Sequence, residues 1–140
     1  VLFVEGVNSV GADGLLLVQD DIPLKEALKI IGNDVIIGIS VKTVEEAVQA
    51  ERDGADYLAI NGVFPTLTKE DLGYCPGLEG VATICRSTRL PVVGIGGINL
   101  GNCCSVIEAG AHGIAVVTAI TMSDDIPDTC QTFLELMRNK

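Results

Sequence analysis

The sequence predicts an α/β fold built on a parallel sheet, and two repeated patterns carry that prediction. Short, mostly apolar runs recur at residues 15–18, 35–39, 57–60, 91–95 and 114–117. Runs of this length are typical of parallel strands that are buried on both faces. The segments between them have helical periodicity. Strands that alternate with helices form a parallel sheet with right-handed crossovers.

The helical segments are predicted from apolar spacing and from one capping signal. Residues 24–31 and 130–137 each place apolar side chains at i, i+3, i+4 and i+7, which is one face of a helix. Thr43 and Glu46 form a capping box that opens a further helix. We expect helices at residues 24–31, 44–51, 81–86, 103–109 and 130–137.

Three junctions between a helix and a strand share a Gly-Ala sequence: Gly11-Ala12-Asp13-Gly14, Gly54-Ala55-Asp56 and Gly110-Ala111-His112-Gly113. Each glycine follows a helical pattern, at the position where helices often end with a residue in the left-handed backbone conformation. We therefore expect left-handed helix ends at these three positions.

The number of strands leaves two architectures open. Residues 1–4 fit either a sixth strand or the start of a helix that ends at Gly11. Five or six βα steps fall short of the eight in a closed barrel. The sheet is either an open, doubly wound sheet or the later part of a barrel whose first units are missing. The chain begins at Val1 without an initiator Met, so we expect a fragment, folded as a single partial domain over residues 1–140.

Composition excludes several classes of function. The formal net charge is −10 and only 4% of residues are aromatic, which argues against a nucleic-acid partner. We find no membrane-spanning run and no targeting segment. Five cysteines without a C-x-x-C pattern favour free thiols in a reducing compartment, so we expect a cytoplasmic protein.

Small or polar residues follow every predicted strand, at the edge of a parallel sheet where sites lie. Asp20 and Asp21 suit either a Mg²⁺ site or helix capping before Pro23. Thr66, Thr68 and Lys69 offer two hydroxyls and a cation for a phosphate or diphosphate. The Gly96-Gly97 turn lets backbone amides approach an anion. Together these features indicate a phosphate-handling enzyme.

The order of these motifs resembles thiamine phosphate synthases. The resemblance runs through Gln19-Asp20-Asp21, Ile37-Gly38-Ile39-Ser40, the specific Pro65-Thr66-Leu67-Thr68-Lys69 segment, Gly94-Ile95-Gly96-Gly97 and Val116-Val117-Thr118. It implies a (βα)8 TIM barrel, of which this chain supplies about the last five or six βα units. The first units, with their Gln-x-Arg-x-Lys motif and Asn-Asp pair, have no counterpart here, so we expect the chain to be inactive alone.

The resemblance also implies a Mg²⁺-dependent transferase of thiamine biosynthesis. It would join hydroxymethylpyrimidine diphosphate to thiazole phosphate, giving thiamine phosphate and diphosphate. Asp21 resembles the metal ligand and Gln19 a substrate-binding residue beside it. Ser40 and Lys69 match the catalytic residues that hold the diphosphate. The positions that match the thiazole-phosphate contacts are Thr66, Thr68, Gly97, Val117 and Thr118.

Some positions differ from the family pattern. Leu16 and Val18 stand where His and Gly are usual, and Ala59 and Asn61 stand in a strand end that is usually richer in glycine. Two alternatives therefore stay open: a thiazole tautomerase-like barrel and a non-catalytic domain that binds thiazole phosphate. The expected partners are the small-molecule substrates, with a possible second copy or a fused domain.

Overall fold

The computed structural model describes residues 2–32, 34–65 and 74–138. The strands are β1 (Gly14–Leu17), β2 (Ile36–Val41), β3 (Tyr57–Asn61), β4 (Val92–Ile95) and β5 (Gly113–Ala115). The helices are α1 (Leu2–Val10), α2 (Leu24–Ile31), α3 (Val44–Asp53), α4 (Gly77–Ser87), α5 (Cys103–Glu108), α6 (Thr118–Thr121) and α7 (Ile126–Arg138). Helix and strand alternate along most of the described chain, as the apolar runs predict.

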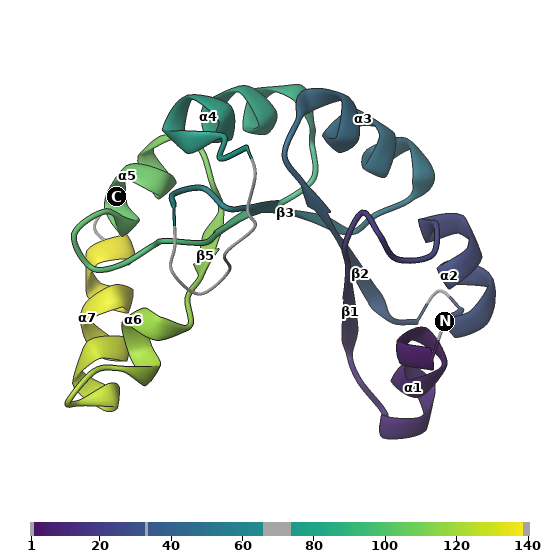
Figure 1. Ribbon diagram of the computed structural model, residues 1–140, viewed down its shortest axis with the longest axis horizontal. Helices are drawn as coiled ribbons and strands as arrows, with labels where there is room; N and C mark the ends of the chain where they lie inside the picture. Colours follow the sequence, from purple (N-terminus) through teal and green to yellow (C-terminus); the bar gives the residue numbers. More distant parts are fainter. Residues whose placement is uncertain (1, 33, 66–73, 139–140) are drawn as a thin grey trace.

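The sheet is parallel throughout, and its strands lie in the order of the sequence, β1-β2-β3-β4-β5. Figure 1 shows an arc with the helices along its convex side and the strands inside. A doubly wound sheet reverses its strand order and carries helices on both faces. The arc has neither feature, so it is an incomplete (βα)8 barrel, and the doubly wound alternative is wrong.

The first residues of the chain belong to helix α1, not to a sixth strand. Val4 and Val7 are 3% and 5% exposed and join the core cluster, which also includes residues of α2 and the sheet. Burial of this apolar face stabilises the helical alternative. The described chain therefore has five strands, the lower of the two expected numbers.

The two faces of the sheet have different environments. On the helix-facing side, Ile37, Leu58 and Val92 are fully buried, and Leu15 and Ile39 are partly buried against the core. On the inner side, Leu16 and Ile36 are 39% and 55% exposed, and both lie on the first two strands. The inner side of the first two strands therefore leaves apolar surface exposed.

The three helix ends at the Gly-Ala junctions have the left-handed backbone that the sequence predicts. Gly11, Gly54 and Gly110 have φ values of 64°, 97° and 109°, so the prediction is confirmed. Each glycine is followed by an alanine that donates its amide to the carbonyl oxygen five residues earlier, at 3.1, 3.0 and 3.3 Å.

A capping box fixes the start of α3, as the sequence predicts. Thr43 Oγ1 accepts a hydrogen bond from the Glu46 amide at 3.2 Å, and Glu46 Oε2 accepts one from the Thr43 amide at 3.4 Å. The same Glu46 oxygen also accepts from the Lys42 amide at 2.6 Å. These contacts hold the backbone directly after β2. Within the described part of the chain, no helix is long and apolar enough to cross a bilayer.

Candidate functional site

The carboxyl ends of the parallel strands bring most of the predicted site residues to one edge of the sheet. At the β1–β2 end lie Gln19, Asp21 and Ser40, which we call the side-chain cluster. At the β4–β5 end lie the Gly96-Gly97 turn and the segment Val117-Thr118, which we call the backbone cluster. The two clusters are separated along the sheet by β3.

Gln19 joins the ends of β1 and β2. Its Nε2 donates a hydrogen bond to the carbonyl oxygen of Ser40 at 2.6 Å. Ser40 is 5% exposed, and its hydroxyl makes no hydrogen bond to another described residue. Strand pairing places Ser40 opposite Ala59, whose small side chain leaves room beside the hydroxyl. The structure therefore presents a buried hydroxyl that is free to bind a ligand oxygen.

Asp21 closes the turn after β1. Its Oδ2 accepts from the Val18 amide at 2.9 Å, and its own amide donates to the Val18 carbonyl at 3.0 Å. The second carboxylate oxygen has no hydrogen-bond partner among the described residues. Pro23 occupies the N-cap position of α2, and no side chain caps that helix. The capping alternative for Asp20 and Asp21 is therefore wrong.

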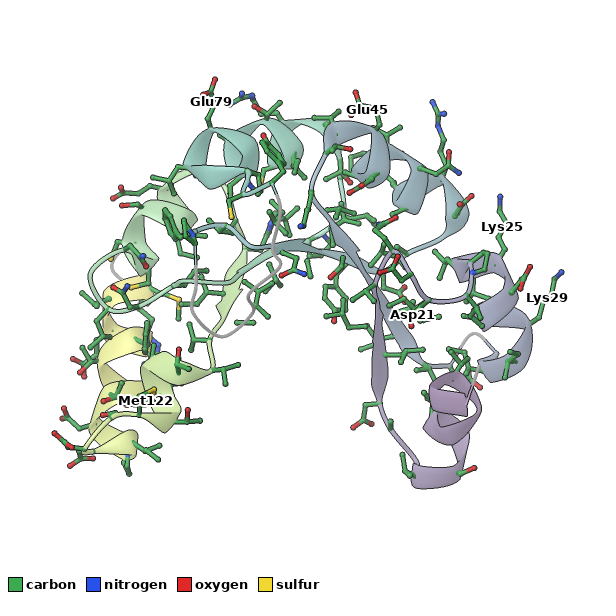
Figure 2. The ribbon with its side chains drawn as sticks, viewed as in Figure 1. Asp21, Lys25, Lys29, Glu45, Glu79 and Met122 are labelled. Atoms are coloured by element: carbon green, nitrogen blue, oxygen red, sulfur yellow. The ribbon has the colours of Figure 1, made fainter. Side chains whose placement is uncertain are left out.

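A cleft of about 500 Å³ opens between α2 and α3 at this turn, with Gln19 and Asp21 in its lining. Asp53 lines the same cleft and forms an ion pair with Lys25, Nζ to Oδ1, at 2.6 Å. A hydrogen bond from Gln49, together with Lys25, lowers the pKa of Asp53 below its usual value. Figure 2 shows Lys25 and Lys29 projecting outward from α2, away from the sheet. The charge of Asp53 is thus balanced locally, whereas Asp21 forms no ion pair with a described residue.

The single carboxylate of Asp21 fits Mg²⁺ only if bound substrate and water supply the remaining ligands of the metal. Within residues 2–32, 34–65 and 74–138, no three His, Cys, Asp or Glu side chains gather as a metal site. Mg²⁺ takes one or two protein carboxylates and fills its shell with water and substrate phosphate. The free oxygen of Asp21 meets that requirement.

The Gly96-Gly97 turn has space for glycine only. Gly96 and Gly97 have φ values of 101° and 65°. A Cβ atom at Gly97 would lie 2.6 Å from the Pro65 carbonyl oxygen, and one at Gly96 would lie 2.8 Å from the Gly62 Cα. The turn packs directly on the segment after β3, and the Phe64 amide donates to the Gly96 carbonyl at 3.1 Å. The absence of side chains leaves the backbone open to an anion.

Two asparagines hold this turn in place, and the sequence analysis missed their role. Asn102 Nδ2 donates to the Gly97 carbonyl at 3.0 Å, and Asn102 Oδ1 accepts from the Asn99 amide at 2.8 Å. Asn99 Oδ1 in turn accepts from the Gly101 amide at 2.8 Å. The available signal was the spacing of two asparagines three residues apart after a Gly-Gly turn.

Val117 and Thr118 lie across from Gly97 because β4 and β5 pair with Ile95 opposite Ala115. Val117 is the N-cap of the short helix α6 and is 56% exposed, so the strand predicted over 114–117 ends two residues early. The first amides of a helix have no intrahelical acceptor. The backbone cluster therefore presents amides from two neighbouring strand ends.

The segment between the two clusters is only partly described. Asn61 ends β3, is half-buried and pairs with Ile95. Thr66, Thr68 and Lys69, which carry the most specific predicted motif, lie outside the described residues. The structure thus joins Gln19 to Ser40 by a hydrogen bond, with Asp21 two residues further along the same turn, and it places Gly97 across from Val117, next to Thr118.

Comparison with known proteins gives one consistent family. The family model described as thiamine monophosphate synthase matches residues 4–120. Thiamine-phosphate synthases of Methanospirillum hungatei and Haloarcula marismortui are 47% and 45% identical to the chain, over 92% and 87% of its length. These alignments cover 63% and 59% of the relatives, so the chain spans about three-fifths of their length.

Solved structures give the same result for the fold. A thiamine phosphate pyrophosphorylase from Pyrococcus furiosus superposes with a TM-score of 0.87 at 38% identity, covering 97% of this chain and 64% of that chain. A 3-hexulose-6-phosphate synthase superposes with a TM-score of 0.76 at 18% identity, which shows a shared fold alone.

Proposed function

Because the chain belongs to the thiamine monophosphate synthase family, we propose that the full-length protein is a transferase of thiamine biosynthesis. It joins hydroxymethylpyrimidine diphosphate to thiazole phosphate, giving thiamine phosphate and diphosphate. The observation that carries the proposal is the pairing of a free carboxylate and a buried hydroxyl with a glycine-lined turn on the same sheet edge. The two anionic substrates need two separate anion-binding sites, and these two groups of residues would supply them.

The reaction we propose is a displacement in which the bond to the leaving diphosphate breaks first. Diphosphate departs with the bonding electron pair, and the thiazole nitrogen then forms a bond to the pyrimidine-methyl cation. No proton transfer is required for this balance. Such a step depends on positioning and on charge stabilisation. The single histidine of the sequence, His112, is used elsewhere, because its Nδ1 accepts from the Val92 amide at 3.2 Å at the opposite edge of the sheet.

The side-chain cluster would take the diphosphate. The Ser40 hydroxyl donates to a diphosphate oxygen, Lys69 adds a positive charge, and Gln19 fixes the backbone that carries Ser40. Asp21 would hold Mg²⁺ through its free carboxylate oxygen. When bound, the metal neutralises charge that develops on the leaving group.

The backbone cluster would take the thiazole phosphate. Amides of Gly97, Val117 and Thr118 donate to the phosphate, and the hydroxyls of Thr66 and Thr68 complete its shell. Phosphate binding after the seventh and eighth strands is common in barrels. This assignment puts the two anions at opposite sides of β3, with the reacting atoms between them.

A second candidate is a domain that binds thiazole phosphate without turnover. Leu16 and Val18 are 39% and 41% exposed beside the side-chain cluster, so apolar surface lies where the pyrimidine would approach. In this candidate, the backbone cluster binds thiazole phosphate and the side-chain cluster takes no part in a reaction.

The test is synthesis by the purified full-length protein supplied with both substrates and Mg²⁺. We expect thiamine phosphate as product, and we expect the chain of residues 1–140 alone to be inactive. Absence of product from the full-length protein, with calorimetric binding of thiazole phosphate, would select the second candidate. Synthesis at a normal rate by residues 1–140 would contradict the expectation for the chain alone.

We also propose a cytoplasmic location. All five cysteines are free thiols, and burial raises the pKa of the Cys85 and Cys103 thiols above the ordinary value. Unpaired cysteines persist in a reducing compartment. Cell fractionation that recovers the protein with cytosolic markers would support this location.

A further inference from the structure

Asn61 is the last residue of β3, and its side chain lies on the inner face of the sheet. Successive residues of a strand point to opposite faces. Leu58 and Ile60 are fully buried on the helix-facing side, so Asn61 points to the inner side. Strand register pairs Asn61 with Ile95, the last residue of β4. The Asn61 amide therefore stands at the carboxyl edge of the sheet, where the candidate site lies.

Asn61 lies between the side-chain cluster and the backbone cluster. Its strand, β3, has β2 on one side and β4 on the other, and Figure 1 shows β3 in the middle of the arc. Ser40 on β2 pairs with Ala59, two residues before Asn61 and on the same face. On the other side, β4 leads directly into the Gly96-Gly97 turn. The proposed function puts the reacting atoms in this position, between the two anions.

The side-chain amide of Asn61 has no partner in the described part of the chain. Asn61 is half-buried, and its side chain makes no hydrogen bond to a described residue. Its neighbours on the inner face, Ala59 and Ile95, are apolar. Asn99 and Asn102 lie at the same edge but bond to backbone groups of their own loop. Because an amide has both N–H donors and a carbonyl acceptor, Asn61 presents both kinds of group to a ligand.

Only one part of the two proposed substrates matches an amide in both directions. Phosphate and diphosphate oxygens accept hydrogen bonds, so they would leave the Asn61 carbonyl oxygen unpaired. The thiazole nitrogen has to stay free, because it forms the new bond. The pyrimidine of thiamine carries an amino group beside a ring nitrogen, and this edge both donates and accepts. An asparagine amide pairs with such an edge through two hydrogen bonds, as it does with adenine.

We propose that Asn61 is a specificity-determining residue whose amide binds the aminopyrimidine edge of the diphosphate substrate. Its Nδ2 donates to the ring nitrogen, and its Oδ1 accepts from the amino group. The inference rests on the proposed function and adds the residue that selects the ring of this substrate. A bound ring displaces water from the amide, so an analogue without the amino group leaves Oδ1 unpaired and binds more weakly.

The side chains around Asn61 suit a flat ring with one polar edge. Ala59 and Ser40, which face each other one step further inside the sheet, are both small. Leu16 is 39% exposed on the inner face of β1 and offers apolar surface to the ring. Two strand spacings, about 10 Å, separate β1 from β3, which is wide enough for a six-membered ring. The inner face thus combines an apolar wall with a single amide.

The test measures how strongly the full-length protein prefers the amino substrate. Calorimetry with Mg²⁺ present gives the Kd of hydroxymethylpyrimidine diphosphate and the Kd of an analogue in which hydrogen replaces the amino group. We expect the wild-type protein to prefer the amino compound about 30-fold and Asn61→Leu to lose most of this preference. Comparing the two ligands in each protein cancels any effect of the substitution on diphosphate binding.

Matched variants separate the amide from other causes. Asn61→Asp keeps an acceptor for the amino group but has no donor for the ring nitrogen, so it should retain part of the preference. Asn61→Gly removes the amide without adding bulk and should lose the preference as Asn61→Leu does. Gln131→Leu makes the same amide-to-leucine change at an exposed position of α7 and should keep the wild-type preference. The Kd of thiazole phosphate should be unchanged in every variant.

Two results overturn the proposal. One is a wild-type protein that does not distinguish the two diphosphates, and the other is an Asn61→Leu variant, folded by circular dichroism, that keeps the wild-type preference. If Asn61→Leu does not fold, Asn61→Gly decides in the same way.

Synthesis of thiamine phosphate is measured separately, which distinguishes this inference from the proposed function. Loss of the preference in Asn61→Leu, in a protein that forms no product, supports the inference and contradicts the proposed synthase. Product formation with an unchanged preference in Asn61→Leu supports the synthase and overturns the role of Asn61.

Discussion

The two ends of the sheet contribute different chemical groups to the candidate site. The side-chain cluster offers a free carboxylate oxygen at Asp21 and a buried hydroxyl at Ser40, positioned by hydrogen bonds from Val18 and Gln19. The backbone cluster offers amides around a turn that only glycine can form. Charge-changing substitutions should therefore act at the first cluster, and steric substitutions at the second.

This difference suits two different anions. A diphosphate that leaves with Mg²⁺ needs a carboxylate for the metal, and its position changes during the reaction. A phosphate that only anchors its substrate needs fixed donors, which a rigid backbone turn supplies without side-chain entropy. The comparison predicts that variants at the two ends have separable effects on rate and on stability.

The largest expected effect is on catalysis at the side-chain cluster. Asp21→Asn keeps an oxygen that accepts from the Val18 amide but removes the charge that would hold the metal. We expect kcat/KM of the full-length protein to fall about 100-fold, with little change in Tm. The control is Asp20→Asn, an adjacent exposed carboxylate, which should have a much smaller effect. Equal losses in the two variants would contradict a specific role for Asp21.

A steric change should break the backbone cluster. Gly97→Ala places a Cβ atom 2.6 Å from the Pro65 carbonyl oxygen at a φ of 65°. We expect the free energy of unfolding to fall by about 2 kcal/mol, measured by urea denaturation, and thiazole phosphate binding to weaken. At Gly113, where no neighbouring atom lies within 4 Å, an alanine should be tolerated. Similar losses at both glycines would refute the steric account.

A smaller effect is expected where the capping box holds the backbone after β2. Thr43→Ala removes the acceptor of the Glu46 amide and should lower the free energy of unfolding by about 1 kcal/mol. Thr43→Ser keeps the hydroxyl and should restore most of that loss. Thermal unfolding of both variants measures the difference, and equal Tm values for the two would show that the cap contributes nothing.

The smallest expected effect is on the pH dependence of stability, and it arises from a contact outside both clusters. Glu51 accepts from Thr88 Oγ1 at 2.6 Å and from the Arg89 amide at 3.2 Å, which ties α3 to the segment before β4. The Thr88 hydroxyl and then Arg89 hold the pKa of Glu51 below its ordinary value of 4.5. Because the folded pKa is the lower one, the stabilisation is present above about pH 4.5 and is lost as the pH falls through the folded value.

The matching measurement is Tm between about pH 7 and about pH 3. Glu51→Gln should lower the Tm near neutral pH and make the acid loss shallower. Glu45→Gln, on the outward side of α3 (Figure 2), should retain the wild-type pH profile. Parallel profiles for wild type and Glu51→Gln would contradict this contribution.

Local pattern predicted much of the fold. The apolar runs located all five strands, and the Thr43–Glu46 spacing located the start of α3, because both signals lie within a few residues. For residues 1–4, by contrast, the local pattern was ambiguous. Their apolar spacing fits two structures, and only packing of Val4 and Val7 into the core favours the helix.

The sequence predicted which residues belong to the candidate site, but it did not predict how they are arranged in space. Gln19 and Ser40 are 21 positions apart, and their hydrogen bond depends on strand register, which no local motif specifies. The role of Asp21 was ambiguous because a carboxylate before a helix is usually a cap, and the turn to Val18 becomes visible only in three dimensions. The hydrogen bond from the Ile37 amide to Asp56 Oδ2 was missed for the same reason, since the two residues are 19 positions apart.

The central claim is that the two clusters bind different anions, and amide NMR of the full-length protein tests it most directly. Thiazole phosphate alone should shift the amides of Gly97, Val117 and Thr118, whereas Mg²⁺ with inorganic diphosphate should shift those of Val18, Asp21 and Ser40. Two separate sets of shifts are the predicted result. A single set moved by both ligands, or thiazole phosphate shifts at Asp21 and Ser40, would contradict the claim.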